Sequence, residues 1–441
     1  MDWELPAQVH TALARLNDAG YEAYIVGGCV RDRIMGRTPK DYDVATSALP
    51  EQTADVFAGE RVIATGLKHG TVTVLLDGEP LEITTFRIDG TYSDSRHPDT
   101  VTFTPSLRED LARRDFTMNA MAYSPETGLV DPFGGQADIA AKCIRCVGEP
   151  EQRFREDALR ILRALRFSAV LGFHIEPKTD AALRAEAALL KNISAERVFS
   201  ELKQLLCGPD VRRVLLDYPD VLGAVLPEIL PMRGFDQRNP HHCYDILEHT
   251  AAAVEAIPAE PGLRLAALLH DVGKPECFFT DGDGVGHFYG HPKVSARIAE
   301  DVLDRLRSDK ATKERVTTIV LNHGLLIEDN EKSVRRVLHR LGTERFFDLL
   351  AMMRADNLGQ SAELRWIQGY YDRLEELARE ILAAEACFSL KDLAVKGGDL
   401  GLPSGPEIGK ALNALLDAVM DGAVANERSA LLEYFRREYK N

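Results

Sequence analysis

The stretch YIVGGCVRD at residues 24–32, followed by KDYDV at residues 40–44, decides the fold of this chain. An apolar strand is expected to run into a glycine pair and a helix start, and a second strand to carry Asp41 and Asp43. Glycines let backbone N–H groups approach a phosphate, and the N-terminus of a helix favours its charge. Strand side chains alternate, so both carboxylates should point to the same side, about 7 Å apart along the chain. Such a pair can hold two divalent ions for an in-line phosphoryl displacement.

Either half of this pattern is weak evidence when taken alone. Glycine pairs after strands are mostly plain turns, and aspartate is common in loops. The ordered combination is more specific, and it resembles the start of the nucleotidyltransferase superfamily with a polymerase-beta-like palm. We therefore predict an α+β fold, in which a small palm with a mixed sheet and helices precedes an extended, mostly α-helical body.

Composition narrows the class of protein. The chain has 441 residues, 45% hydrophobic and 28% charged, as in a soluble globular protein of roughly three domains. The net charge of -16 disfavours RNA binding by bulk attraction, so any RNA contact needs a local basic surface. We see no signal peptide and no apolar run near the roughly 20 residues of a membrane span. Seven scattered cysteines fit a reducing cytoplasm, so we expect a cytoplasmic protein without membrane contact.

Hydrophobic periodicity divides the chain into a mixed head and a helical remainder. Residues 1–20 have helical spacing, and strands are expected at Thr71–Leu76, Leu81–Arg87 and Thr100–Phe103. Residues 227–243 are rich in Pro, Gly and Asn and are typical of a linker. The predicted domains are a head at 1–140, a helical neck at 141–230, a histidine-bearing helical domain at 238–360 and a helical tail at 361–441.

Three features accompany the paired carboxylates in the head. Glu82 could be a third carboxylate that holds a metal or accepts a proton from an attacking hydroxyl, or a solvated strand residue. Residues 89–98 form a loop of Gly, Asp, Ser and Pro, which suits a mobile lid or a plain connection. Arg113 and Arg114 could grip a triphosphate through planar guanidinium groups, or form a surface ion pair with Asp115.

A basic helix is predicted for RFREDALRILRALR at residues 153–166. Leucines at three-residue spacing form an apolar stripe, and charged residues at the same spacing share the other surface. A charged face of this kind is ordinarily solvated and salt-bridged. The charged positions are Asp157, Arg160, Arg163 and Arg166, and the apolar ones are Leu159, Leu162 and Leu165.

Six motifs in this order resemble one family. They are GGCVRD at 27–32, the paired aspartates, the loop at 89–98, RRDFTMNA at 113–120, DPFGG at 131–135 and REDALRILRALRF at 155–167. Together they look like a class II tRNA nucleotidyltransferase, the family of CCA-adding enzymes. The resemblance is dense over residues 20–210, and tail motifs at 405–409 and 422–426 also look like this family.

The resemblance implies roles for single residues. Asp41 and Asp43 would bind Mg²⁺ in catalysis, with Glu82 as a further catalytic candidate. The incoming nucleotide would be held by Gly28, Arg31, Arg114, Asp157, Arg160, Arg163 and Arg166. Of these, Asp157 and Arg160 would read the base edge, because a carboxylate accepts from the exocyclic amine of C or A and an arginine donates to ring acceptors.

The implied reaction is template-independent addition of C, C and A to the 3′ end of tRNA. The RNA 3′-hydroxyl would attack the α-phosphate of CTP or ATP, and pyrophosphate would leave. CC-adding relatives lack the lid loop, so its presence favours full CCA addition or A addition. An A-adding enzyme and a poly(A) polymerase are alternatives. Neck and tail are expected to bind RNA by its shape and backbone.

A second constellation lies in the histidine-bearing domain. His249 begins it, His270 and Asp271 follow an apolar helix at 263–269, and Asp356 ends it. This order resembles the HD metal-dependent phosphohydrolase domain, so an HD-type helical domain is part of the predicted body. Imidazoles and carboxylates on bundle helices suit Mn²⁺, Ni²⁺ or Mg²⁺.

His291 and His323 are further candidates, for a second ion or for phosphate. The HD resemblance implies phosphatase or cyclic phosphodiesterase activity at RNA ends, whereas an inert scaffold is the plain alternative. Two other readings differ in class: a phosphohydrolase whose head senses nucleotides, and a non-enzymatic RNA-binding protein. The paired carboxylates disfavour the last, because without metals they would repel phosphate.

Overall fold

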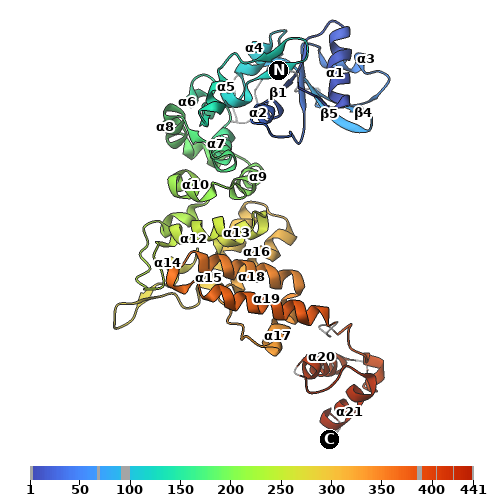
Figure 1. Cartoon of the computed structure of the whole chain (residues 1–441), viewed down its shortest axis with the longest axis vertical. Helices are drawn as coiled ribbons and strands as arrows, with labels where there is room; N and C mark the ends of the chain where they lie inside the picture. Colours follow the sequence, from blue (N-terminus) through green and yellow to red (C-terminus); the bar gives the residue numbers. More distant parts are fainter. Residues whose placement is uncertain are drawn as a thin grey trace. The chain divides into compact units, whose positions relative to one another are not determined.

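The computed structural model describes residues 3–66, 70–90, 100–384, 390–403, 405–420 and 422–439. The chain divides into two compact units, Met1–Leu230 and Pro231–Asn441 (Figure 1). Of the loop predicted to act as a lid, residues 91–98 lie outside the described part of the chain. In the described ranges, no helix combines the length and the apolar character that crossing a bilayer requires.

The described part of the head is built on a mixed sheet in the order β3-β4-β5-β2-β1-β8-β9. β2 and β5 run parallel, and the other neighbours run antiparallel. Its strands are β1 (Ala23–Val26), β2 (Asp43–Thr46), β3 (Arg61–Gly66), β4 (Thr71–Leu76), β5 (Glu79–Thr85), β8 (Ala122–Ser124) and β9 (Gly128–Val130). The central position of β1 and β2 brings the glycine pair and the aspartates to the middle of the sheet.

Helices with an apolar stripe cover this sheet. α1 (Ala7–Asp18) buries Val9, Leu13 and Leu16, as the helical spacing predicts. α1 and α3 (Pro50–Val56) contact each other and β5 (Figure 1). α2 (Gly28–Ile34) starts at the glycine pair, as predicted.

Two predictions for the head need correction. The strand expected at Leu81–Arg87 is divided, because β5 ends at Thr85 and β6 (Arg87–Asp89) pairs with β7 (Val101–Phe103) in a separate sheet. Asp41 precedes β2, so of the two aspartates only Asp43 lies on the strand. The physical reason is that Asp43 pairs with Val26, the last residue of β1, after which the chain turns into α2.

The predicted basic helix of the neck is interrupted at Asp157. α6 (Pro150–Glu156) ends before this residue, and α7 (Leu159–Leu171) begins two residues after it. The prediction of one continuous helix is therefore wrong. Asp157 has extended backbone angles, and its carboxylate accepts the Leu159 N–H at 3.1 Å, which satisfies a donor at the start of α7. The leucine stripe is buried as predicted.

The remaining helices of the first unit are short. They include α4 (Leu107–Ala112), α5 (Gly135–Ala140), α8 (Pro177–Ala185), α9 (Ala195–Leu206), α10 (Val211–Asp217) and α11 (Pro219–Leu222). α7 contacts α6, α9 and α10, so it forms the centre of the neck.

The second unit contains a helical bundle around α18 (Thr343–Leu358). The other helices are α12 (Ile246–Ala256), α13 (Pro261–Leu269), α14 (Lys274–Cys277), α15 (His291–Arg305), α16 (Lys310–Asn322), α17 (Glu331–Leu341) and α19 (Ile367–Ala383). α18 contacts α12, α13, α16, α17 and α19. A hairpin of β12 (Phe279–Thr280) and β13 (Gly286–His287) precedes α15. The tail has α20 (Pro406–Met420) and α21 (Arg428–Tyr439) around a small core that includes Leu415 and Phe435.

Candidate active site

A pocket of about 430 Å³, the head pocket, lies where the head meets the neck and collects eight of the ten residues predicted for nucleotide transfer; Asp41 and Glu82 are not part of its lining. Of the predicted residues, its lining includes Gly28, Arg31, Asp43, Arg114, Asp157, Arg160, Arg163 and Arg166. It also includes Gly27, Arg113, Asp115, Asn119 and Phe167. The pocket thus joins the end of β1, the start of β2 and the face of α7.

The glycine pair makes the turn from β1 into α2. Gly27 has a φ of 78°, a left-handed conformation that glycine adopts without strain. A Cβ atom at Gly27 would lie 2.9 Å from Arg114 Nη1. Glycine at this position therefore lets a predicted nucleotide contact approach the backbone of the turn.

The three predicted carboxylates lie at neighbouring strands. Asp43 begins β2, and its register partner on β5 is Glu82. Partial burial raises the pKa of Asp43, and the carboxylates of Asp41 and Glu82 add to this rise, although Arg114 opposes it. A bound cation would relieve this repulsion between like charges, and carboxylate oxygens are ligands that Mg²⁺ prefers. The charge and the ligand type therefore suit a divalent ion, although among the described residues these three carboxylates do not form a group with all ligand atoms within 4.8 Å of one another.

A buried aspartate orients two of the arginines. Asp115 accepts hydrogen bonds from Arg163 Nη2 at 2.6 Å and Nε at 2.9 Å, and from Asn119 Nδ2 at 3.0 Å. Asn119 Oδ1 in turn accepts Arg31 Nη1 at 2.8 Å. Burial opposes ionisation of Asp115, but Arg163 and Asn119 outweigh burial and lower its pKa to about 2. This network fixes Arg31 and Arg163 before any nucleotide binds.

The adjacent arginines of the RRDF motif share a different aspartate. Asp110 is 1% exposed and lies 2.8 Å from Arg113 Nη2 and 3.3 Å from Arg114 Nη2. Burial opposes ionisation of Asp110, but the two guanidinium groups lower its pKa. The ion pair that the sequence suggested with Asp115 is thus formed with Asp110, which lies one helical turn before the two arginines.

The two residues predicted to read the base each have another partner. Asp157 Oδ2 accepts Arg197 Nη2 at 3.0 Å. Arg160 donates to the Arg113 carbonyl at 2.9 Å and to Glu156 at 3.0 Å. Both line the pocket, so a base that entered it would compete with these partners.

Phe167 gives the pocket an aromatic wall. The guanidinium carbons of Arg166 and Arg31 lie 4.0 Å and 5.1 Å from the centre of its ring. Arg166 also pairs with Glu201 of α9. Stacking on a ring holds a planar guanidinium group in one orientation.

The predicted histidines and aspartates of the second unit also converge. Two groups each have ligand atoms within 4.8 Å of one another, and Asp271 belongs to both. The first group is His249, His270, Asp271 and Asp356; the second is Asp271, His291 and His323. All six residues predicted for this site are brought together by α12, α15 and α18 and by the C-terminal ends of α13 and α16.

Backbone carbonyls orient the four imidazoles. Their Nδ1 atoms lie 2.7–3.0 Å from carbonyl oxygens of Gly359, Ala267, Phe288 and Val320, for His249, His270, His291 and His323 in that order. A carbonyl only accepts, so each Nδ1 carries a proton and each Nε2 faces the cluster. The Nε2 atoms of His249 and His270 lie 3.3 Å apart, and those of His291 and His323 lie 3.0 Å apart. One ion about 2.1 Å from both nitrogens of a pair fits such spacings.

Charges around the cluster affect its aspartates and histidines differently. Asp271 is 1% exposed and lies 2.7 Å from Lys274 Nζ. Burial opposes ionisation of Asp271, but His270 and Lys274 hold its pKa well below the usual value. Burial, with the charge of His270, lowers the pKa of His323 to about 4. The ionised Asp271 and a neutral His323 are forms that bind metal. Burial opposes protonation of His249 and His270, but Asp271 and Asp356 outweigh it and raise both pKa values, that of His270 to about 10, so metal binding at these two rings requires loss of a proton.

Comparisons with known proteins identify the family. The poly A polymerase head domain matches residues 23–145, the RNA and SrmB-binding site of polymerase A matches 172–232, and tRNA nucleotidyltransferase domain 2 matches 290–435. The CCA-adding enzyme of Geobacillus thermodenitrificans is 36% identical over 438 residues, which cover 97% of each chain. The chain belongs to the CCA-adding enzyme family.

Solved structures of CCA-adding enzymes share the fold. The crystal structure of the Bacillus stearothermophilus CCA-adding enzyme in complex with CTP gives a TM-score of 0.72 at 33% identity and covers 98% of both chains. The Thermotoga maritima CCA-adding enzyme complexed with tRNA gives a TM-score of 0.61 at 20% identity, with 97% of this chain and 94% of that chain covered, and supports the fold alone. The predicted family and fold class are confirmed, whereas the HD-type assignment rests on the geometry of the second unit.

Several residues that contact the predicted site residues of this member of the CCA-adding enzyme family were not predicted from the sequence. Asp115 and Asn119 lie in the quoted RRDFTMNA motif, and their four-residue spacing was the available signal. Arg197 and Glu201 come from α9, and no local pattern connects them with Asp157 and Arg166. The bond of Lys274 to Asp271 was likewise not predicted.

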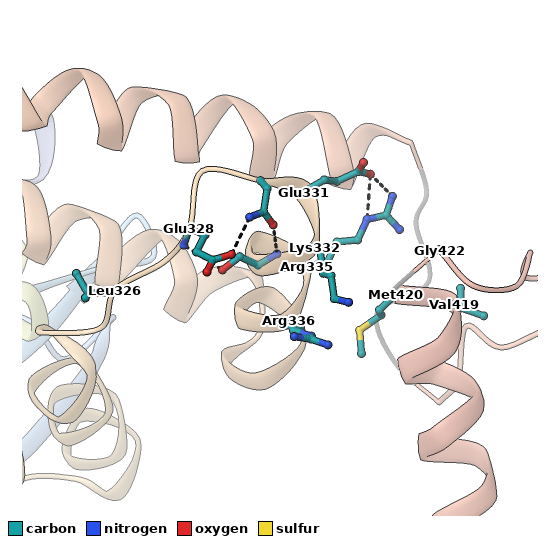
Figure 2. Close-up of a pocket in the computed structure, with 11 residues that line it drawn as sticks. Leu326, Glu328, Glu331, Lys332, Arg335, Arg336, Val419, Met420 and Gly422 are labelled. Carbon is teal, nitrogen blue, oxygen red and sulfur yellow. Dashed lines mark hydrogen bonds and ion pairs between the residues drawn. The ribbon is translucent and has the colours of Figure 1, made fainter.

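Figure 2 shows another groove, of about 720 Å³, which α17 and the end of α20 border. Its charged side chains have both signs, and Arg335 pairs with Glu331. Val419 and Met420 add apolar surface. None of the described residues that line this groove was predicted from the sequence to take part in catalysis or to bind metal.

Proposed function

We infer that this protein adds C, C and A to the 3′ end of tRNA without a template, using CTP and ATP and releasing pyrophosphate. The observation that carries this inference is the head pocket, where a strand carboxylate, a glycine turn, a set of arginines and Asp157 face one space. Relatives named CCA-adding enzymes match almost the whole chain, and such enzymes have been solved with CTP and with tRNA. The six described cysteines form no disulfide with one another, which supports the predicted cytoplasmic location.

We assign catalysis to Asp43, which lines the pocket, and to Asp41 and Glu82, whose charges act on Asp43. Divalent ions bound there, with Mg²⁺ as the expected ion, would activate the RNA 3′-hydroxyl and offset the charge of the leaving pyrophosphate. Glu82 shares the carboxylate cluster and is a candidate to accept the hydroxyl proton. Arg114, held by Asp110 and close to Gly27, is assigned to the triphosphate.

We assign base selection to Asp157 and Arg160. The carboxylate would accept from the exocyclic amine of C or A, and the guanidinium would donate to a ring acceptor on the same edge. In the structure the Asp157 carboxylate is bonded to Arg197 and the Arg160 guanidinium to the Arg113 carbonyl. A bound base would therefore replace these partners. Arg31, Arg163 and Arg166 hold the remainder of the nucleotide.

Extension of tRNA that lacks its 3′ CCA tests the main proposal. Wild-type protein, Mg²⁺ and all four nucleotides should yield C, C and A followed by a stop, read by sequencing of the 3′ end. Addition of A alone to tRNA ending in CC would instead assign an A-adding enzyme, and a long A tail would assign a poly(A) polymerase. No extension would overturn the proposal.

The HD-type cluster supports a second candidate function. We propose that it binds a divalent transition metal, Mn²⁺ or Ni²⁺, and hydrolyses phosphoesters at RNA ends. The convergence of four Nε2 atoms on two carboxylates carries this proposal. Because Asp271 belongs to both ligand groups, the cluster has room for a second ion at His291 and His323.

Metal content decides between this function and an inert scaffold. Wild-type protein equilibrated with Mn²⁺ or Ni²⁺ and then desalted should retain up to two ions per chain, and His323→Ala should lose one. His270→Ala should lose metal and metal-dependent hydrolysis of 2′,3′-cyclic AMP. Metal-free wild-type protein, or retention of both ions by His270→Ala, would favour the scaffold.

A further inference from the structure

The β12–β13 hairpin borders the metal cluster. A pocket of about 340 Å³ is lined at one side by Asp271, His291 and His323 and at another by His287 and Tyr289. Lys274 lies in the same lining and places a cation beside the cluster. The pocket therefore connects the predicted metal ligands with the rings of the hairpin.

Alternation along the hairpin divides its aromatic residues into two sets. Phe278 and Phe288 pack together at 5.5 Å between ring centres, and Phe278 packs against Phe235 at 5.2 Å. Phe288 is 9% exposed, and its carbonyl accepts His291 Nδ1. This inner set fixes the hairpin to a metal ligand.

The outer set is Phe279, His287 and Tyr289. His287 lies 5.3 Å from Phe279 and 5.3 Å from Tyr289 between ring centres, with interplanar angles of 29° and 21°. His287 Nε2 lies 2.7 Å from Asp281 Oδ2, which fixes the middle ring. Tyr289 is 75% exposed and Phe279 is 44% exposed. Cross-strand pairing accounts for Phe279 and His287, but Tyr289 lies beyond β13 and still aligns with them.

We propose that Phe279, His287 and Tyr289 form a stacking platform for the base of a nucleotide whose phosphate reaches the metal cluster. Every nucleobase has a π face, and exposed aromatic rings bind such faces without selecting a sequence. Lys274, together with the metal ion proposed for the cluster, would supply positive charge for the phosphate at the other side of the pocket. The ligand is therefore a nucleoside phosphate, either free or at the end of an RNA strand, rather than a phosphate without a base. This inference rests on the proposed HD-type site and names its substrate class.

Fluorine NMR of the full chain tests the platform without using catalysis. The protein is labelled with 3-fluorotyrosine, and the Tyr289 signal is the one that disappears in Tyr289→Phe. Because the fluorine shift reports only on its surroundings, nucleotides bound in the head should not change this signal. AMP should shift the Tyr289 signal saturably, with or without Mn²⁺, whereas ribose 5-phosphate, which has no base, should leave it unchanged. A short RNA that ends in CCA is titrated by the same signal. Whichever of AMP and this RNA has the lower apparent Kd shows whether the platform binds a free nucleotide or the end of an RNA strand.

Phe279→Ala should weaken the AMP titration about 5- to 100-fold, the range expected for loss of one stacking ring. Trp366→Ala is the matched control, because Trp366 is a 72% exposed ring of the same unit outside the pocket, and its titration should match wild type. Equal responses to AMP and ribose 5-phosphate, or equal affinities in the two variants, would overturn the platform. If hydrolysis depends on His270 but AMP does not shift the Tyr289 signal, the platform proposal is overturned and the hydrolase proposal stands. A Tyr289 response without any hydrolysis would support the platform and overturn the hydrolase.

Discussion

Gly27 shows how one residue can be tied to the nucleotide site. Its φ is 78°, and a Cβ there would meet Arg114 Nη1 at 2.9 Å. Gly27→Ala should lower the free energy of unfolding by about 1–2 kcal/mol through backbone strain. Displacement of Arg114 should also raise the KM for CTP and ATP about ten-fold, as expected for one weakened charged hydrogen bond. Urea unfolding and steady-state extension measure the two effects.

Gly20→Ala is a matched control for that substitution. Gly20 has a φ of 87°, and nothing lies within 4 Å of a Cβ built there. This variant should lose similar stability and keep the wild-type KM. Equal KM values for the two variants would show that Arg114 does not depend on Gly27.

Asp115 should make part of the stability depend on pH. Its folded pKa is about 2, below the ordinary value of about 3.9, so its contribution is fully present above pH 4 and is lost as the pH falls toward 2. The shift corresponds to about 2–3 kcal/mol. Asp115→Asn should therefore flatten the pH dependence of the unfolding free energy between pH 4 and pH 2, measured by urea titration. Asp55→Asn, at an exposed position of α3, should keep the wild-type slope, and parallel curves for Asp115→Asn would contradict this account.

At the scale of elements, the break between α6 and α7 places Asp157 in a connection rather than on a rigid helix. Its carboxylate can therefore change partners without bending either helix. Asp157→Ala should relax base choice, raising incorporation of U or G about 5- to 100-fold, and should slow addition of C and A less. A four-nucleotide competition read by sequencing measures this selectivity. Arg197→Ala, which frees Asp157 from its resting partner, should keep wild-type selectivity; unchanged selectivity in Asp157→Ala would remove the assignment.

Elements were predictable where the determinant is local. The β-branched run at Thr71–Leu76 and the glycine pair specify a strand and a turn by their own chemistry, and both are confirmed. The break at Asp157 was not predictable, because the leucine stripe on either side fits a continuous helix. It depends on a bond from the Asp157 carboxylate to the backbone, which competes with helix continuation.

The sites follow the same rule. Motif order predicted eight of the residues that line the head pocket and all six of the histidine cluster, although His249 and Asp356 are far apart in the sequence. It did not predict Arg197 and Glu201 as partners of Asp157 and Arg166, because those contacts depend on how α9 packs against α7.

At the scale of the whole molecule, the carboxylate cluster of the head and the histidine cluster belong to different compact units. A substitution in one cluster should therefore leave the activity or metal binding of the other unchanged. Asp43→Ala should abolish extension of tRNA and retain bound Mn²⁺ or Ni²⁺. His270→Ala should lose that metal and extend tRNA at the wild-type rate. Extension and elemental analysis on the same preparations test this separation, with circular dichroism to confirm folding. Loss of both properties in either folded variant would contradict it.

The histidine cluster has a consequence for how such a centre changes during evolution. Its four rings are oriented by main-chain oxygens of Gly359, Ala267, Phe288 and Val320. Every amino acid brings such an oxygen, so the bond itself does not depend on the side chains of Ala267, Phe288 and Val320, which are restricted only by their burial. Gly359 differs, because a Cβ there would lie 2.8 Å from His249 Nδ1. An alignment of descendants would therefore show invariant histidines and an invariant Gly359, while the other three positions vary among residues of similar size, and the lack of covariation there would conceal a support that the main chain supplies.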